Sequence, residues 1–143
     1  MIFQHAYEVI IDDIFLSLDG LLTGSEVFLK LEGLNPAGSI KLKSAVSMVE
    51  DAERRGLLWP GGRIIESSSG SLGIALATVA AGKGYSFTCV TDPNISLQSL
   101  AILKALGAEV IQVDRRDANG GFLGTRIACI KERLSADPGL VWL

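Results

Sequence analysis

The stretch RIIESSSGSLGIALATVAAGKGYSFTCVT, residues 63–91, decides the fold. It opens with a short apolar run at 63–66 and ends with a second one at 86–91, and both have the composition of buried strands. Between them a loop of small residues leads into a helical segment at 74–81, which the glycines at 82–84 close. A strand, a helix and a second strand joined by short loops predict a βαβ unit with parallel strands.

The C-terminal part of the chain continues this alternation. After a turn that begins at Asp92, the pattern predicts a helix over 96–106 and a third strand over 109–113. A helix over 122–134 and a strand-like end at 141–143 follow. Because the connections between parallel strands are right-handed, we expect an α/β fold: an open, mostly parallel twisted sheet with helices on both faces.

The N-terminal part holds one more strand and one more helix. Residues 26–32 alternate between apolar and polar side chains, which predicts a strand, and a turn containing Asn-Pro and Gly follows at 33–39. The spacing of apolar residues predicts a helix over 40–55, with Gly56 as its C-terminal cap. Lys41 is expected within the first turn of that helix.

The composition excludes several classes of protein. The chain has 143 residues, 48% hydrophobic and 20% charged, which fits one globular domain and not a disordered chain. Its net charge of -3 argues against a nucleic-acid partner, and no apolar run approaches the roughly 18 residues that cross a bilayer. The N-terminus shows no secretory leader, and Cys89 and Cys129 make neither a disulfide framework nor a metal site. We therefore expect a cytoplasmic protein without a nucleic-acid partner, a membrane partner or a metal.

The first motif that points to chemistry is NPAGSIK, residues 35–41, which places a lysine directly after a glycine-containing turn. The positive end of a helix, together with partial burial, favours the neutral amine of a lysine, and that form makes Schiff bases. The alternative is a solvated lysine at the start of a helix, without a chemical role.

The second motif is ESSSGSLG, residues 66–73, which links an expected strand to an expected helix. It offers hydroxyl groups and backbone N–H groups at the positive end of the helix, so it is a candidate site for a carboxylate or a phosphate. The alternative is a turn of small residues chosen only for tight packing. The motif is neither a Walker A loop nor a G-x-G-x-x-G dinucleotide fingerprint.

In this order and spacing, the two motifs resemble those of the fold-type II pyridoxal-phosphate enzymes, the family of cysteine synthase and cystathionine β-synthase. This family carries a strand ending in Lys-Leu-Glu, here at 30–32, and then Asn-Pro-x-Gly-Ser-x-Lys, here at 35–41. It next carries Glu-x-Thr/Ser-Ser-Gly-Asn-x-Gly, here at 66–73, and the stretch at 103–110 is similar to a later motif of the family. The resemblance implies the tryptophan synthase β-like fold of these enzymes.

The resemblance also implies roles for individual residues. Lys41 is the implied catalytic residue and binds pyridoxal 5'-phosphate, while Ser71 faces the ring hydroxyl of that cofactor. The implied ligands of the substrate carboxylate are the loop residues Ser67, Ser68, Ser69, Gly70 and Ser71. The sequence departs from the family where Ser71 replaces the usual Asn, and where Leu42 and Lys43 replace the usual Asp-Arg.

Three further stretches, at 40–45, 89–94 and 120–126, resemble one branch of the family, the 2,3-diaminopropionate pathway synthases of siderophore and peptide-antibiotic biosynthesis. This branch implies a β-replacement on O-phospho-L-serine, or a similar activated serine, by way of an aminoacrylate, with L-glutamate as the nucleophile. Arg126 is a candidate contact for that acidic substrate; the alternative is a solvated helix arginine. Two other functions stay open: a cysteine synthase acting on O-acetylserine or O-phosphoserine, and a non-catalytic binding or interaction module.

The resemblance divides the chain into two parts. Residues 1–34 are expected to pack on the large domain of the enzyme, apart from the body of the chain. Residues 35–143 are expected to form the small N-terminal αβα domain that carries the Schiff-base lysine. The apolar end at 141–143 predicts an N-terminal fragment with an incomplete large domain, inactive by itself. The family implies a homodimer acting on amino-acid substrates.

Overall fold

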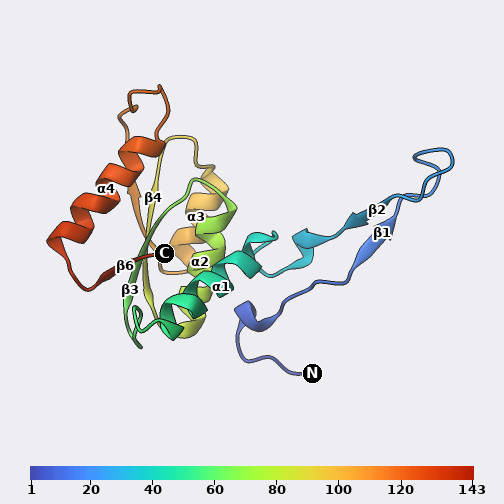
Figure 1. Cartoon of the computed structure of the whole chain (residues 1–143), viewed down its shortest axis with the longest axis horizontal. Coiled ribbons are helices and arrows are strands. Elements are labelled where there is room, and N and C mark those ends of the chain that lie inside the picture. The colour runs from blue at the N-terminus through green and yellow to red at the C-terminus, as the bar shows by residue number, and fades with distance from the viewer.

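Four parallel strands form the centre of the molecule. The computed structural model describes residues 1–143, and its main sheet has the strand order β5-β4-β3-β6 (Figure 1). The strands are β3 (Arg63–Ser67), β4 (Ser86–Thr91), β5 (Glu109–Gln112) and β6 (Leu140–Trp142). In the register, Ile65 of β3 pairs with Thr88 of β4 and with Trp142 of β6. The expected open parallel sheet is confirmed.

Helices cover both faces of this sheet, as the sequence predicts (Figure 1). One face carries α1 (Lys41–Arg54), α2 (Ser71–Lys83) and α3 (Leu97–Ala105), and the other carries α4 (Leu123–Ala136). Alternate residues of a strand point to opposite faces. Accordingly, Ile64 packs into the core beneath α1 and α2, whereas Ile65 packs with Val90 and with Ile130 of α4. No helix has the length and apolar composition of a membrane span.

The central helix, α2, owes its position to small side chains. It contacts α1, α3 and β4, and its buried residues include Ala75, Ala77 and Ala80. Such residues let neighbouring elements approach closely without leaving voids. Gly84 ends the helix with a left-handed backbone, φ +76°, that glycine adopts without strain. The helix-closing glycines of the sequence are therefore confirmed at this position.

Among the boundaries that differ from the sequence prediction, the starts of two helices bear on the site. Helix α2 begins at Ser71 and not at Ile74, because the first turn is stabilised by contacts from the preceding loop that the apolar pattern does not reveal. Helix α1 begins at Lys41 itself, so this lysine is the first helical residue. At the other end of α1, Gly56 has φ +67° and follows the last helical turn, as predicted.

The N-terminal segment contains an antiparallel hairpin that projects from the body (Figure 1). Its strands are β1 (Phe15–Ser17) and β2 (Phe28–Lys30), and short 3-10 turns, η1 (Ala6–Glu8) and η2 (Glu32–Leu34), flank it. β2 is shorter than the predicted strand, and β1 was not predicted from the sequence. Before the hairpin, Tyr7 packs against the core, close to Gly82 of α2. That the segment packs on a further domain stays a prediction.

Candidate functional site

The topology places one crevice at the carboxyl ends of the strands. Strands β3, β4 and β5 follow one another in one direction, and β6 then returns to the opposite side of β3. In open parallel sheets, ligands bind outside the carboxyl ends of the strands where the strand order reverses. Here the reversal lies between β3 and β6, directly beside the loop at 68–70. Because α1 and α2 lead back to the amino ends of β3 and β4, their N-termini also lie toward this edge.

Lys41 offers an unengaged amine at the start of α1. Its side chain is exposed, and its amine makes no hydrogen bond or ion pair within the chain. The nearby lysines are engaged: Lys30 Nζ lies 2.6 Å from a carboxylate oxygen of Asp12, and Lys43 Nζ lies 2.8 Å from one of Glu32. The partial burial expected for Lys41 is not found in this chain by itself, because the Lys41 side chain is exposed, whereas its neighbour Leu42 enters the core.

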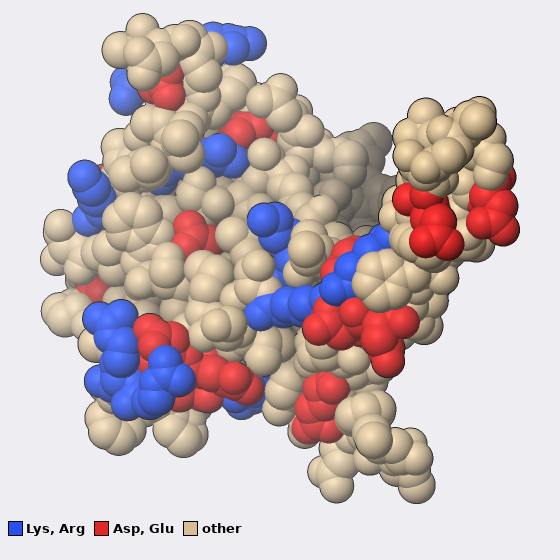
Figure 2. Space-filling view, turned by 45° about the vertical axis from the view of Figure 1, so that its right-hand side comes forward, with Lys and Arg blue, Asp and Glu red and all other residues tan.

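The engaged lysines belong to a cluster of four charges, Asp12, Lys30, Glu32 and Lys43, which joins the base of the hairpin to α1. Lys43 also pairs with Asp12. Basic and acidic side chains gather where the hairpin meets the body (Figure 2). Hydrogen bonds from Lys30 and Lys43 lower the pKa of Asp12 to about 2. The bonds from Asp12 and Glu32 raise the pKa of Lys43, so this amine is held charged within the cluster.

The loop after β3 is held by the side chain of Ser68. Its hydroxyl oxygen accepts hydrogen bonds from the backbone N–H of Gly70, at 3.2 Å, and of Gly73, at 2.9 Å. The thiol of Cys89 in β4 donates to the backbone carbonyl of Ser68 at 3.3 Å. The loop therefore has a defined shape before any ligand binds.

The same loop leaves several donors unused. The backbone N–H groups of Ser69, Ser71 and Leu72 donate to no acceptor of the protein, and the hydroxyls of Ser69 and Ser71 also lack partners. Free N–H groups at the first turn of a helix, with the positive end of the helix dipole, form a site for an anion. The predicted anion site is thus geometrically available at the start of α2.

Two residues at the end of β3, the buried Glu66 and the half-buried Ser67, lie before the loop. Glu66 accepts hydrogen bonds from the backbone N–H of Ser67, at 2.6 Å, and from Trp142 Nε1, at 3.1 Å. Burial raises the pKa of Glu66. The hydroxyl oxygen of Ser67 is buried without a partner. By strand alternation this hydroxyl shares the α4 face with Ile65, so the structure does not bring it together with the free donors of the loop.

An ion pair that the sequence did not predict lies beyond β4. Arg126 of α4 contacts Asp92 at 3.2 Å, and their side chains are only 14% and 3% exposed. Arg126 is therefore not the solvated arginine considered as an alternative. Its Nε and the hydroxyl of Thr91 lack hydrogen-bond partners. The spacing from Asp92 to Arg126 carries no sequence signal, because the contact arises only when α4 folds over the sheet.

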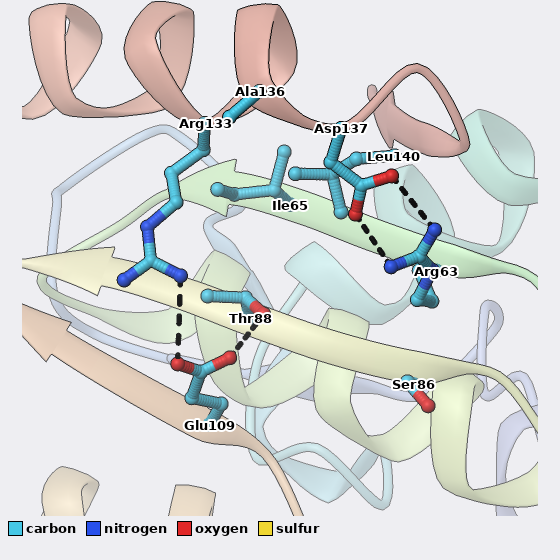
Figure 3. A pocket seen from close by; sticks show the side chains of 9 residues that line it. All are labelled: Arg63, Ile65, Ser86, Thr88, Glu109, Arg133, Ala136, Asp137 and Leu140. Atoms are coloured by element: carbon cyan, nitrogen blue, oxygen red, sulfur yellow. Dashed lines mark hydrogen bonds and ion pairs between the residues drawn. The ribbon is translucent and has the colours of Figure 1, made fainter.

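A second hollow lies at the opposite edge of the sheet (Figure 3). Its volume is about 310 Å³, and its charged groups satisfy one another. Arg63 makes a bidentate pair with Asp137 at 2.5 and 2.7 Å, and Glu109 accepts from Thr88 at 2.9 Å and lies 3.9 Å from Arg133. Because the charged groups of this hollow pair with one another, it is a weaker candidate for the functional site than the crevice at the carboxyl ends of the strands.

Fold and site together define a class: an α/β protein that has an unengaged lysine amine and unpaired N–H groups of a helix N-terminus at the same edge of its sheet. The comparison with known families agrees. The family model of pyridoxal-phosphate dependent enzymes matches residues 15–143, and the chain belongs to this family. The resemblance found in the sequence is thereby confirmed, and so is the family's dependence on pyridoxal phosphate.

Individual relatives narrow the comparison. The chain is 50% identical over 119 residues to the N-(2-amino-2-carboxyethyl)-L-glutamate synthase of Ralstonia nicotianae, which covers 83% of this chain and 35% of the relative. Among solved structures it is similar to a hydrogen sulfide-producing enzyme from Fusobacterium nucleatum, with a TM-score of 0.87, 29% identity, and coverage of 99% of this chain and 45% of that one. It is also similar to O-ureido-L-serine synthase, with a TM-score of 0.85, 31% identity, and coverage of 99% and 44%. The chain thus spans less than half the length of these relatives.

The residues present fit a pyridoxal-phosphate cofactor. The family attaches the cofactor through a lysine, and Lys41 has an amine without any partner. Ser71, in the position of the family's asparagine, is the first residue of α2, and its hydroxyl is also unengaged. Because a serine side chain is shorter than that of asparagine, Ser71 reaches less far toward a ring hydroxyl.

Proposed function

We propose that this chain is the lysine-bearing part of an enzyme that replaces the β-substituent of O-phospho-L-serine, or a similar activated serine, with L-glutamate as the nucleophile. The observation that carries the proposal is that the chain has both an unengaged amine, on Lys41, and free backbone N–H groups, at 69, 71 and 72. Both lie at the edge where a parallel sheet binds ligands. The relative from Ralstonia nicotianae supports glutamate as the second substrate.

The chain's own residues divide the work. Pyridoxal phosphate, when bound, withdraws electrons from the α-carbon of an amino acid. Lys41 holds this group through its amine and, when that amine is free, moves the proton at the substrate α-carbon. The loop donors at 69–72 bind the α-carboxylate and so orient the α-carbon; one such charge-assisted hydrogen bond is worth about 1.5–3 kcal/mol.

The structure offers one group for the second substrate. Arg126 lies at the same edge of the sheet; its guanidinium pairs with Asp92 at 3.2 Å, and it would have to exchange this partner for a carboxylate of glutamate. A cysteine synthase is the alternative, supported by the similarity to the hydrogen sulfide-producing enzyme. The purified full-length protein should consume O-phospho-L-serine faster with glutamate than with sulfide. Faster turnover with sulfide would favour the cysteine synthase.

Replacement of Lys41 tests the enzymatic proposal itself. The purified protein loaded with pyridoxal phosphate should absorb in the visible range, and Lys41→Ala should abolish this band and all turnover, because covalent attachment and proton transfer are lost together. Lys104→Ala, which removes an exposed lysine of α3, is the matched control and should leave both unchanged. A colourless wild-type protein would instead support the non-catalytic binding module.

The same proposal includes the wider organisation expected of the family. Residues 1–34 would pack on a large domain, and 35–143 would form the small domain. The exposed apolar side chains of the hairpin, among them Phe15, Leu16 and Phe28, support a covering partner. A homodimer, a cytoplasmic location and a place in siderophore biosynthesis also belong to the proposal. Sedimentation of the full-length protein tests the dimer.

A further inference from the structure

Three small residues from three elements interlock beneath the loop at 69–72, and we call them the loop anchor: Ser68, Gly73 and Cys89. Ser68 is 7% exposed and Cys89 is fully buried. A Cβ atom on Gly73 would lie 3.0 Å from Cys89 Sγ and 3.3 Å from Ser68 Oγ, so only glycine fits without a shift. The anchor therefore joins the end of β3 to the first turn of α2 and to β4.

The hydroxyl of Ser68 has no capacity left for a ligand. A serine hydroxyl has one proton to donate and two lone pairs that accept. Here the lone pairs accept from Gly70 N–H and Gly73 N–H, and the proton is directed to the carbonyl of Gly70 at 3.3 Å. The hydroxyls of Ser69 and Ser71 make no such bonds. Ser68 thus differs from the other serines of the motif, because only its hydroxyl is fully hydrogen-bonded within the loop.

Cys89 fixes the other side of Ser68. Its thiol donates to the carbonyl of Ser68 from directly beneath the loop, and no other side chain bonds to that carbonyl. Burial raises the pKa of Cys89 to about 11, so the thiol keeps the proton that it donates. A thiol is a weak donor, but in a buried position an unpaired carbonyl is costly.

We propose that Ser68 and Cys89 are positioning residues, which hold the loop so that the N–H groups of Ser69, Ser71 and Leu72 face the carboxylate of the amino-acid substrate. This inference rests on the proposed function, and it changes the role that the family motif implies for Ser68. The serine hydroxyl shapes the site from inside and does not contact the carboxylate. Cys89 acts through Ser68 and never meets the substrate.

Ser68→Ala is the first test, with Ser68→Thr as the conservative variant. The alanine leaves Gly70 N–H without an acceptor and leaves Gly73 N–H with only the carbonyl of Gly70, at 3.1 Å, so the loop is held less firmly. We expect the KM and the spectroscopic Kd for O-phospho-L-serine to rise about tenfold, with a smaller change in kcat and an unchanged cofactor content. Threonine keeps the hydroxyl and should restore both values. Ser135→Ala, which removes one exposed hydrogen bond of α4, is the matched control.

Hydrogen exchange separates a positioning role from a direct contact. In the cofactor-free protein, the amides of Gly70 and Gly73 should exchange faster in Ser68→Ala than in the wild type, before any substrate is present. If Ser68→Ala weakens substrate binding but leaves these amides unchanged, the hydroxyl contacts the substrate directly and the inference is wrong. It is also wrong if Ser68→Ala binds O-phospho-L-serine as the wild type does.

Cys89 gives a second, independent test. Cys89→Ser keeps a donor of similar size and should bind O-phospho-L-serine within about threefold of the wild type, whereas Cys89→Val, which has no donor and adds bulk against Gly73, should weaken binding about tenfold. Cys129→Val is the matched control on α4. Equal binding by Cys89→Val and the wild type would overturn the role of Cys89. A wild-type protein that binds neither cofactor nor substrate would overturn the proposed function instead.

Discussion

Glu66 shows how burial constrains a single residue beneath the functional loop. Because burial raises its pKa from the ordinary 4.5, the folded state disfavours the charged carboxylate. Glu66 therefore contributes stability that is fully present below 4.5 and is lost as the pH rises. Its oxygen atom nevertheless receives hydrogen bonds from Ser67 and Trp142, which any replacement must still accept.

Glu66→Gln follows from this balance. The amide keeps an acceptor and carries no charge, so the variant should be more stable than the wild type near neutral pH and of equal stability near pH 4. Urea unfolding at the two pH values measures the difference. Glu132→Gln, at an exposed position of α4, should show no such pH-dependent gain. A Glu66→Gln protein that is destabilised equally at both pH values would show that burial does not disfavour the ionised form of Glu66.

At the residue scale, the sequence predicted which segments form the candidate site better than it predicted the role of each side chain in them. The motifs at 35–41 and 66–73 indicated a lysine and an anion loop, and the structure brings both to the same edge of the sheet. The sequence did not distinguish Ser68 from Ser69, because adjacent serines differ only in the partners that folding gives them. The buried contact of Asp92 with Arg126 was unpredictable for the same reason.

At the element scale, helix α3 shows how a short helix depends on its packing. It has nine residues, too few to be stable in isolation, and its N-cap is the predicted Ser96, whose hydroxyl accepts from the N–H of Ser99 at 3.0 Å. Only one of its residues, Leu103, is buried. The stability of this helix in the fold therefore rests on its cap and on that one side chain.

Two leucines of this helix form a matched pair for mutagenesis. Leu103 is 1% exposed and Leu97 is 85% exposed. Leu103→Ala should lower the free energy of unfolding by roughly 2–5 kcal/mol, because it removes buried surface and leaves a cavity. Leu97→Ala should change it by less than about 0.5 kcal/mol. Chemical denaturation compares the two, and similar losses for both would contradict the packing of α3 on the core.

The elements that the sequence predicted are those with a strong pattern. The alternation of strands and helices from 63 to 142 was predicted with boundaries close to the observed ones. Strand β1 was missed because it has only three residues and pairs with β2 across a long turn, so its position depends on its partner. The early start of α2 was missed because the Ser68 hydroxyl stabilises it, and hydrophobic periodicity does not report on such contacts.

At the scale of the whole molecule, the cluster of Asp12, Lys30, Glu32 and Lys43 fixes the hairpin to the body. The hairpin is a two-stranded sheet with little packing of its own, and such hairpins are marginally stable. Asp12 lies on the N-terminal side of the hairpin, and the other three members lie within residues 30–43. Its carboxylate pairs with both Lys30 and Lys43. The lowered pKa of Asp12 means that this pairing persists until the pH falls from 3.8 toward about 2.

Asp12→Asn tests this connection. Loss of the charge should release the base of the hairpin, so the amides at 14–18 and 27–31 should exchange hydrogen faster near neutral pH, while those of the main sheet stay unchanged. Asp13→Asn is the matched control, since Asp13 is adjacent and makes no ion pair. In the wild type, moderate salt should produce part of the same effect, because salt screens exposed charges. Equal exchange in both variants would contradict the role of the cluster.

The central claim, that the amine of Lys41 carries the cofactor, has one direct test. The purified full-length protein is loaded with pyridoxal phosphate, reduced with borohydride to make the attachment permanent, digested, and mapped by mass spectrometry. We predict that the phosphopyridoxyl mass falls on Lys41 alone, with Lys30, Lys43 and Lys104 unmodified. An unmodified Lys41, or a label confined to another lysine, would contradict the account.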